Sequence, residues 1–128
     1  MDSKYFSEDE QVCKCCGKGA ELINPLLLEQ LDKIREIWGG PVFCECMYRC
    51  PKHNYEIGGV RNSQHTVTED RPCCNAADIW VDGDYWTFYY TVINSELFDS
   101  VGCYPPGEGE FVHVDVRADA TLPNYYLW

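Results

Sequence analysis

The chain has 128 residues, of which 45% are hydrophobic and 14% aromatic, a composition typical of an ordered globular protein. At this length we expect one domain, residues 1–128, built around a single hydrophobic core. The formal net charge of -11 argues against nucleic acid as a partner, because neutralising phosphates requires a basic face.

No apolar run approaches the ~18 residues that a membrane span requires, so no membrane insertion is expected. The opening segment, MDSKYFSEDE, lacks the basic region followed by an apolar region that marks a signal peptide. We therefore expect the protein to be synthesised in the cytoplasm. The expected oligomeric state is the simplest one, a monomer.

The clearest element in chain order is a helix over residues 25–38. Asn24 is a favourable N-cap, and Pro25 suits the first helical position. The Gly39-Gly40-Pro41 sequence ends the helix. Apolar residues recur at three- and four-residue spacing and form one core-facing side: Leu27, Leu28, Leu31, Ile34 and Trp38.

Shorter elements follow the helix. A strand carries Arg49 at its end, and Pro51 excludes the next residues from a sheet because proline cannot donate to the ladder. Strands alternating irregularly with two helices predict an α+β fold, an antiparallel sheet with flanking helices. The predicted order is strand 42–48, a glycine-rich connection 55–61, strand 79–81, helix 85–98, strands 101–104 and 110–116, and a tail 125–128 packed back onto the domain.

The nine cysteines admit three interpretations: free thiols, one or more disulfides, or a second, structural zinc. An odd number prevents complete internal pairing, and reduced thiols are the default state without an export signal. The spacings C-x-C-C and C-x-C-x3-C differ from the paired C-x2-C knuckles of usual structural zinc sites. The two groups with these spacings are Cys13/Cys15/Cys16 and Cys44/Cys46/Cys50.

Two histidines and an aspartate, His65, Asp78 and His113, each lie beside a turn or within an apolar strand. Such a set is typical of a catalytic zinc (Zn2+), with a fourth position left for water. Period-two alternation places His113 and Asp115 on one face of their strand, so Asp115 is a candidate partner for the His113 ring. The ordinary alternatives are a turn histidine and an aspartate that bounds a strand.

Glu110 stands three residues before His113, close enough in sequence to act as a base beside such a metal. Strict alternation places Glu110 on the opposite face of the strand from His113. It therefore reaches the metal only if the strand begins at or after it, or if the strand carries a bulge. The alternative is a solvated charge at the strand edge.

Four segments together resemble the zinc D-alanyl-D-alanine carboxypeptidase family of cell-wall peptidases. They are 48–54 (YRCPKHN), 58–66 (GGVRNSQHT), 76–79 (AADI) and 111–117 (FVHVDVR). Segments 13–17 (CKCCG) and 24–29 (NPLLLE) resemble the short phage members, so the resemblance covers about residues 5–117. It implies the fold that this family shares with the amino-terminal domain of hedgehog proteins.

The resemblance also implies roles for individual residues. His65, Asp78 and His113 would ligate zinc, which polarises the scissile carbonyl and lowers the pKa of a water to about 7. The other matching positions imply Glu110 as the general base, Arg49 as the residue that offsets the developing oxyanion, and Ser63 as a residue that holds the substrate.

The chain departs from the family pattern at two places. Twelve residues, 66–77, separate His65 from Asp78, more than in the family and without its glycine. The additional residues 67–74 either form a surface loop, block the cleft, or bring a cysteine to the metal. In front of Arg49, the family's Ser-Gly pair is replaced by Glu45-Cys46-Met47.

We therefore expect a zinc-dependent peptidase that hydrolyses a peptide bond in peptidoglycan stem peptides, most simply D-Ala-D-Ala. An endolysin-like phage protein released through a partner's pore would reach the wall without a signal peptide. The alternatives are a binding module that keeps the fold without activity, and a cysteine-based redox or zinc-scaffold protein.

Overall fold

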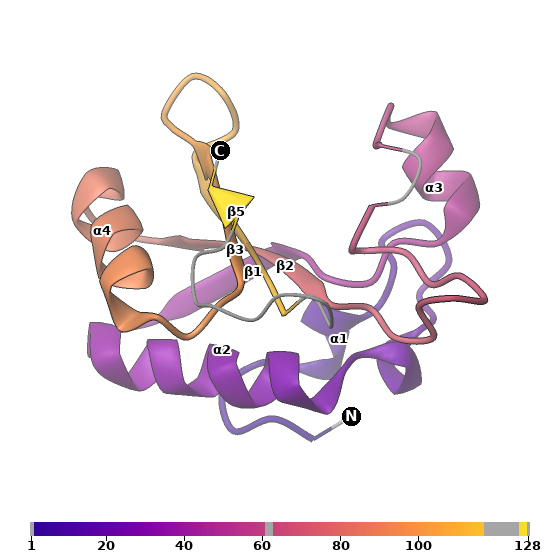
Figure 1. Ribbon diagram of the computed structural model, residues 1–128, viewed down its shortest axis with the longest axis horizontal. Helices are drawn as coiled ribbons and strands as arrows, with labels where there is room; N and C mark the ends of the chain where they lie inside the picture. The colour runs from indigo at the N-terminus through magenta and orange to yellow at the C-terminus, as the bar shows by residue number, and fades with distance from the viewer. Residues whose placement is uncertain (1, 61–62, 117–125, 128) are drawn as a thin grey trace.

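The computed structural model describes residues 2–60, 63–116 and 126–127, and a single sheet with helices against it forms its centre (Figure 1). The strands lie in the order β1-β2-β4-β3-β5. Pairing is antiparallel from β1 through β2 and β4 to β3, whereas β5 pairs parallel to β3. The predicted α+β class is therefore confirmed. The strands span Val42–Cys46 (β1), Ala76–Val81 (β2), Ser100–Tyr104 (β3), Phe111–Asp115 (β4) and Tyr126–Leu127 (β5).

Helix α2, Pro25–Trp38, confirms the predicted helix at both ends. The Asn24 side chain accepts a hydrogen bond from the backbone N–H of Leu26, and the N–H of Gly39 donates to the Arg35 carbonyl. Figure 1 shows α2 running along one face of the sheet. The buried residues of this helix are Leu27, Leu28, Leu31 and Ile34, all on the predicted face.

Helix α4, Tyr85–Ser95, is shorter than the predicted 85–98. The Asp84 side chain caps its first turn, and Glu96 adopts a left-handed conformation with φ 56° that ends it. Phe88 of α4 meets Trp38 of α2 edge to face, with ring centroids 5.2 Å apart. The two helices therefore share one core with the sheet.

Two short helices depart from the predicted pattern: α1, Glu8–Gln11, and α3, Pro51–Glu56. A capping box of Ser7 and Glu10 starts α1. The proline that we interpreted as a strand breaker starts α3 instead, because its fixed φ suits the first helical position behind the Cys50 cap. Strand boundaries also differ: β1 ends at Cys46 instead of residue 48, β2 begins at Ala76 instead of 79, β3 begins at Ser100, and β4 spans only Phe111–Asp115.

The C-terminal tail reaches the sheet, since Tyr126–Leu127 pairs with β3 as expected. Tyr125 and Trp128 of the predicted tail lie outside the described residues, as do 61–62 and Arg117 of the segments quoted above. Among the helices of the described ranges, none combines the length and the apolar character needed to cross a membrane.

Candidate metal centre

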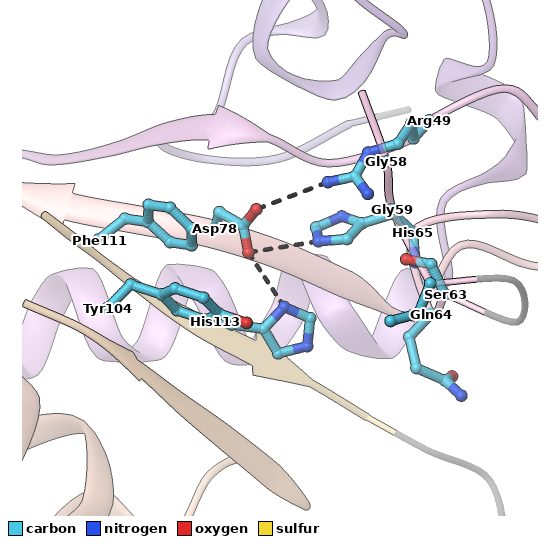
Figure 2. Close-up of a pocket in the computed structure, with 11 residues that line it drawn as sticks. Arg49, Gly58, Gly59, Ser63, Gln64, His65, Asp78, Tyr104, Phe111 and His113 are labelled. Atoms are coloured by element: carbon cyan, nitrogen blue, oxygen red, sulfur yellow. Dashed lines mark hydrogen bonds and ion pairs between the residues drawn. The ribbon is translucent and has the colours of Figure 1, made fainter. Parts of the chain in front are cut away.

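Strands β2 and β4 bring two of the three predicted ligands face to face. Asp78 of β2 stands opposite His113 of β4 in the antiparallel register. One carboxylate oxygen of Asp78, Oδ1, lies 3.0 Å from His113 Nδ1 and 3.2 Å from His65 Nε2 (Figure 2). His65 arrives from the loop before β2. The predicted ligand set therefore converges, although 47 residues lie between His65 and His113 in the sequence.

The remaining ring nitrogens are held by other groups. His65 Nδ1 lies 2.7 Å from the Met47 carbonyl oxygen, and His113 Nε2 lies 2.8 Å from Asp115 Oδ2. A metal-binding histidine commonly donates its second N–H to a carbonyl or carboxylate, which fixes the ring and the tautomer. The donors His65 Nε2, Asp78 Oδ1 and His113 Nδ1 are thus oriented for a zinc ion, and the residues present fit this metal.

Burial and neighbouring charges shift the pKa values of Asp78 and His65 in opposite directions, and the charges have the larger effect. His65, Asp78 and His113 expose only 3%, 6% and 8% of their surface. Burial would raise the pKa of Asp78, but the two imidazoles outweigh it and hold that pKa well below its usual range. Burial would lower the pKa of His65, but the Asp78 carboxylate raises it to about 10. Because only neutral imidazole binds a metal, zinc binding at neutral pH would be coupled to release of a proton from His65.

Arg49 lies beside the same carboxylate. Its Nη2 is 3.9 Å from Asp78 Oδ2, and its Nη1 donates to Asn54 Oδ1 at 2.8 Å. The buried Nε of Arg49 has no hydrogen-bond partner among the described residues, so this side chain keeps an unused donor. A cation held next to a metal ligand is suited to offset negative charge that develops on a bound substrate.

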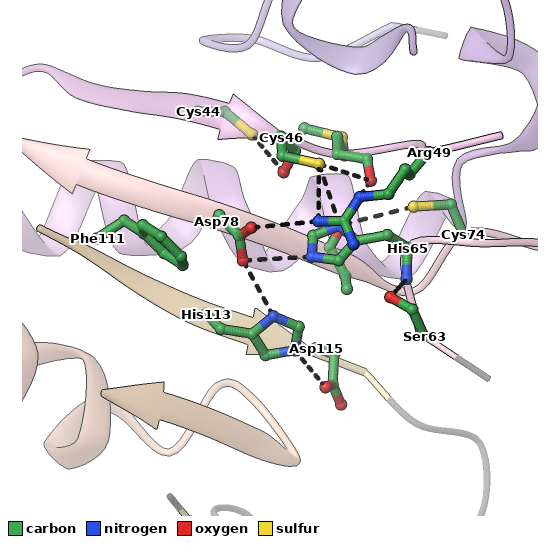
Figure 3. A network of polar contacts seen from close by, with 12 residues as sticks. Cys44, Cys46, Arg49, Ser63, His65, Cys74, Asp78, Phe111, His113 and Asp115 are labelled. Carbon is green, nitrogen blue, oxygen red and sulfur yellow. Dashed lines mark hydrogen bonds and ion pairs between the residues drawn. The ribbon is translucent and has the colours of Figure 1, made fainter. Parts of the chain in front are cut away.

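Cys46 is a contact of the centre that the sequence interpretation missed. Its sulfur lies 3.7 Å from His65 Nδ1 and 3.5 Å from Arg49 Nη2 (Figure 3). The bulge between Cys44 and Cys46 in β1 accompanies this placement. Cys46, His65 and Asp78 each have a potential ligand atom, and these three atoms lie within 4.8 Å of one another, so the Cys46 thiol is itself a candidate contact of a metal at this centre.

A pocket of about 470 Å³ opens over the centre (Figure 2). Tyr104 and Phe111 stack with ring centroids 4.6 Å apart and form one wall. Ser63 also lines the pocket, and its hydroxyl accepts a hydrogen bond from the His65 backbone N–H at 3.2 Å. The lining residues are Arg49, Gly58, Gly59, Val60, Ser63, Gln64, His65, Asp78, Tyr104, Phe111 and His113.

Glu110 is the predicted site residue that does not line this pocket. Its side chain is exposed and borders a separate hollow together with Glu45, Trp80 and Gly109. Because β4 begins at Phe111, Glu110 is released from strict alternation, as its assignment required. Glu110 also has φ 57°, a left-handed conformation that is costly for a side chain other than glycine and that often marks functional positions.

The additional residues 67–74 leave the pocket open, because none of them lines it. The Arg71 guanidinium donates to the carbonyl oxygens of Ser63 at 2.6 Å and Thr66 at 3.2 Å, which holds the loop against its own base. Cys74 is buried against Ile23, with its backbone N–H donating to the Leu22 carbonyl at 2.7 Å. The insertion is therefore a surface excursion.

Asn54 and Gly59 position Arg49. In the sequence, the only signal of this role was the pair of glycines, Gly58 and Gly59, in the predicted connection. The Asn54 amide donates to the Val60 carbonyl while its oxygen accepts from Arg49. A Cβ at Gly59 would overlap the Asn54 side chain and lie 2.8 Å from Arg49 Nη1. The glycine is therefore required for this close approach.

We expect Gly59→Ala to lower kcat/KM by roughly 10²-fold, because displacement of a positioned group by about 1 Å has this effect. Steady-state kinetics measures the change, and zinc content should stay at the wild-type level. Gly40→Ala is the matched control, since its Cβ meets only the Trp38 ring at 3.7 Å. Unchanged kinetics in Gly59→Ala would contradict the positioning role.

The comparisons with known proteins identify the family. The family model described as peptidase M15 matches residues 4–115, which is most of the chain. No curated protein matches it. M15 peptidases are metal-dependent enzymes that usually use zinc, and the matched range contains the three predicted ligands and Arg49. The chain belongs to the peptidase M15 family, the family of zinc D-Ala-D-Ala carboxypeptidase-like metallopeptidases.

Proposed function

We propose that this metallopeptidase hydrolyses a peptide bond in peptidoglycan stem peptides, most simply the terminal D-Ala-D-Ala bond. The observation that carries the proposal is the convergence of His65 Nε2, Asp78 Oδ1 and His113 Nδ1 below an open pocket, with Arg49 beside them. This arrangement brings together side chains that could hold a metal, a cationic side chain and an open pocket beside them.

His65, Asp78 and His113 would hold the zinc ion, which when bound supplies Lewis-acid activation of the scissile carbonyl and of water. Asp115 and the Met47 carbonyl keep the two imidazoles in the orientation that ligation needs. Arg49, whose Nη2 lies 3.9 Å from Asp78 Oδ2, would offset negative charge that develops on the carbonyl oxygen of a bound substrate.

We assign proton transfer to Glu110. It stands three residues before His113, and the left-handed turn at its backbone directs the chain into β4 immediately before the ligand. Its exposed carboxylate would accept a proton from the water that attacks the scissile carbonyl, and would then return this proton to the leaving amine. Ser63 and the stacked Tyr104 and Phe111 rings bound the pocket in which the substrate would lie.

Among the described residues that line the pocket, Arg49 is the only lysine or arginine. The chain carries a net charge of -11, so a local cation is needed to attract an anionic peptide end. This favours a substrate with a free carboxylate close to the scissile bond, as in a D-Ala-D-Ala terminus.

The test is incubation of the zinc-loaded protein with muropeptides that end in D-Ala-D-Ala, followed by mass spectrometry. Release of free D-alanine is expected, and a chelator should abolish it. An L-Ala-L-Ala peptide serves as the matched control and should remain intact. Products cut within the stem would change the proposal to an endopeptidase, and the absence of any product would overturn it.

A second candidate function is a muropeptide-binding module without turnover. The placement of Glu110 outside the pocket lining favours it. Under this alternative, the zinc-loaded protein retains muropeptides in equilibrium dialysis and releases no product. For either function we propose an endolysin-like role, in which the protein reaches the cell wall through a phage pore.

A further inference from the structure

Three cysteines gather at a place that the proposed chemistry does not use. The sulfurs of Cys13, Cys16 and Cys50 all lie within 4.8 Å of one another. None of the three lines the pocket over the metal centre. Cys15 lies between Cys13 and Cys16 in the same turn, which makes it the candidate for a fourth ligand. Three sulfur atoms thus lie close together, with a fourth cysteine in the same turn.

The local backbone has the form of a metal-binding turn. Cys13 and Cys16 are spaced as C-x2-C, and Gly17 follows them with φ 67°, a conformation that favours glycine. The Gly17 N–H donates to the Cys13 carbonyl at 2.7 Å and closes the turn. The sequence analysis did not single out this pair, because the intervening Cys15 gives the segment a C-x-C-C appearance.

Backbone N–H groups point at two of the sulfurs. The Cys50 N–H donates to Cys13 Sγ at 3.4 Å, and the His53 N–H donates to Cys50 Sγ at 3.4 Å. Burial would raise the pKa of Cys13, but backbone N–H groups of Cys50, Cys15 and Cys16 outweigh it and lower that pKa to about 7. Such donors stabilise thiolates, the form in which cysteine binds a metal.

We propose that Cys13, Cys15, Cys16 and Cys50 bind a structural zinc ion, separate from the catalytic metal. A tetrahedral site with Zn–S bonds of about 2.3 Å places its sulfurs about 3.8 Å apart, so only a small contraction of the observed group is needed. Four thiolate ligands leave no open position for water or substrate. The site therefore stabilises the fold and takes no part in turnover.

Disulfides account for this geometry less well. Each sulfur can join only one other in a disulfide, whereas Cys13, Cys16 and Cys50 are mutually close. Of the Cys44/Cys46/Cys50 spacing group, Cys50 lies with Cys13 and Cys16, whereas Cys46 lies with His65 and Asp78. Cys44 and Cys46 lie on β1, and the Cys44 thiol donates to the Cys46 carbonyl at 3.3 Å. Cys50 joins the N-terminal turn instead.

The proposed ion would link the N-terminal turn that contains Cys13 and Cys16 to the segment that contains Arg49 and Cys50. Cys50 directly follows Arg49, whose backbone N–H donates to the His65 carbonyl at 3.0 Å. The Tyr48 N–H donates to the Gln11 carbonyl at 3.1 Å, just before the turn. Loss of the ion would therefore loosen the segment between the two sites.

The test compares zinc content per chain, by elemental analysis under reducing conditions without chelator, in the full-length protein and its variants. Wild type should hold two zinc ions, and Cys16→Ser and Cys50→Ser should each hold one. Serine at position 50 retains the N-cap of α3, and position 16 is exposed, so both variants should fold. Cys73→Ser is the matched control and should hold two.

Cobalt gives an independent reading that needs no substitution. The cobalt-loaded wild type should show the sulfur-to-metal charge-transfer band of a thiolate site. His65→Ala and Cys46→Ala should keep the band, and Cys50→Ser should lose it. A single zinc ion in wild type that Cys16→Ser retains, or oxidation of these four cysteines to disulfides in the intact mass, would overturn the proposal. Muropeptide cleavage tests the catalytic centre separately, so the two proposals fail independently.

Discussion

His65→Ala is expected to lose the zinc ion of the centre between β2 and β4, and with it all peptidase activity. Loss of a residue that only hydrogen-bonds to a metal ligand weakens metal binding by up to about 10²-fold. Removal of one of the three ligands themselves should weaken zinc binding by more than this. The variant also leaves the buried Asp78 carboxylate without one of its two imidazole neighbours. Elemental analysis and competition with a chromophoric chelator measure the loss.

His53→Ala is the matched control for this experiment, because His53 lies in α3 and does not line the pocket. It should keep full zinc content and full activity. With the thiolate site present, His65→Ala should fall from two zinc ions to one. Activity in a His65→Ala protein shown to have lost that ion would refute the proposed centre.

Glu110→Gln is expected to lower kcat by about 10²–10⁴-fold, the usual contribution of a general base, while zinc stays bound. Glutamine preserves size and hydrogen bonding but cannot take up the proton. Glu110→Gly should lose activity to the same extent and yet raise the free energy of unfolding by roughly 0.5–1 kcal/mol, because glycine relieves the left-handed backbone. Steady-state kinetics and urea unfolding measure the two effects.

Glu108→Gln controls for the removal of a negative charge from the same exposed turn. It should leave kcat and stability unchanged. If Glu110→Gln retains wild-type kcat, another group is the base. Glu110 would then lie outside the pocket because it takes no part in catalysis.

The sequence by itself determined much of the local structure and predicted which residues could bind a metal. Helix α2 was predicted to the residue because its signals are local: Asn24 caps it, Pro25 starts it and Gly39 ends it. His65, Asp78 and His113 were predicted as ligands because their residue types suit zinc and their segments resemble a family. A proline that can either break a strand or start a helix has two local meanings, and α3 was missed for that reason.

The tertiary structure alone decided which distant groups meet. The pairing of Asp78 with His113 depends on the register of β2 and β4, and the approach of Cys46 to His65 depends on the bulge in β1. Cys50 joined Cys13 and Cys16 because the N-terminal turn packs beside the start of α3, a contact that no spacing along the chain encodes. Local propensity acts over a few residues, whereas these contacts follow from burial of the shared core, which is a property of the whole fold.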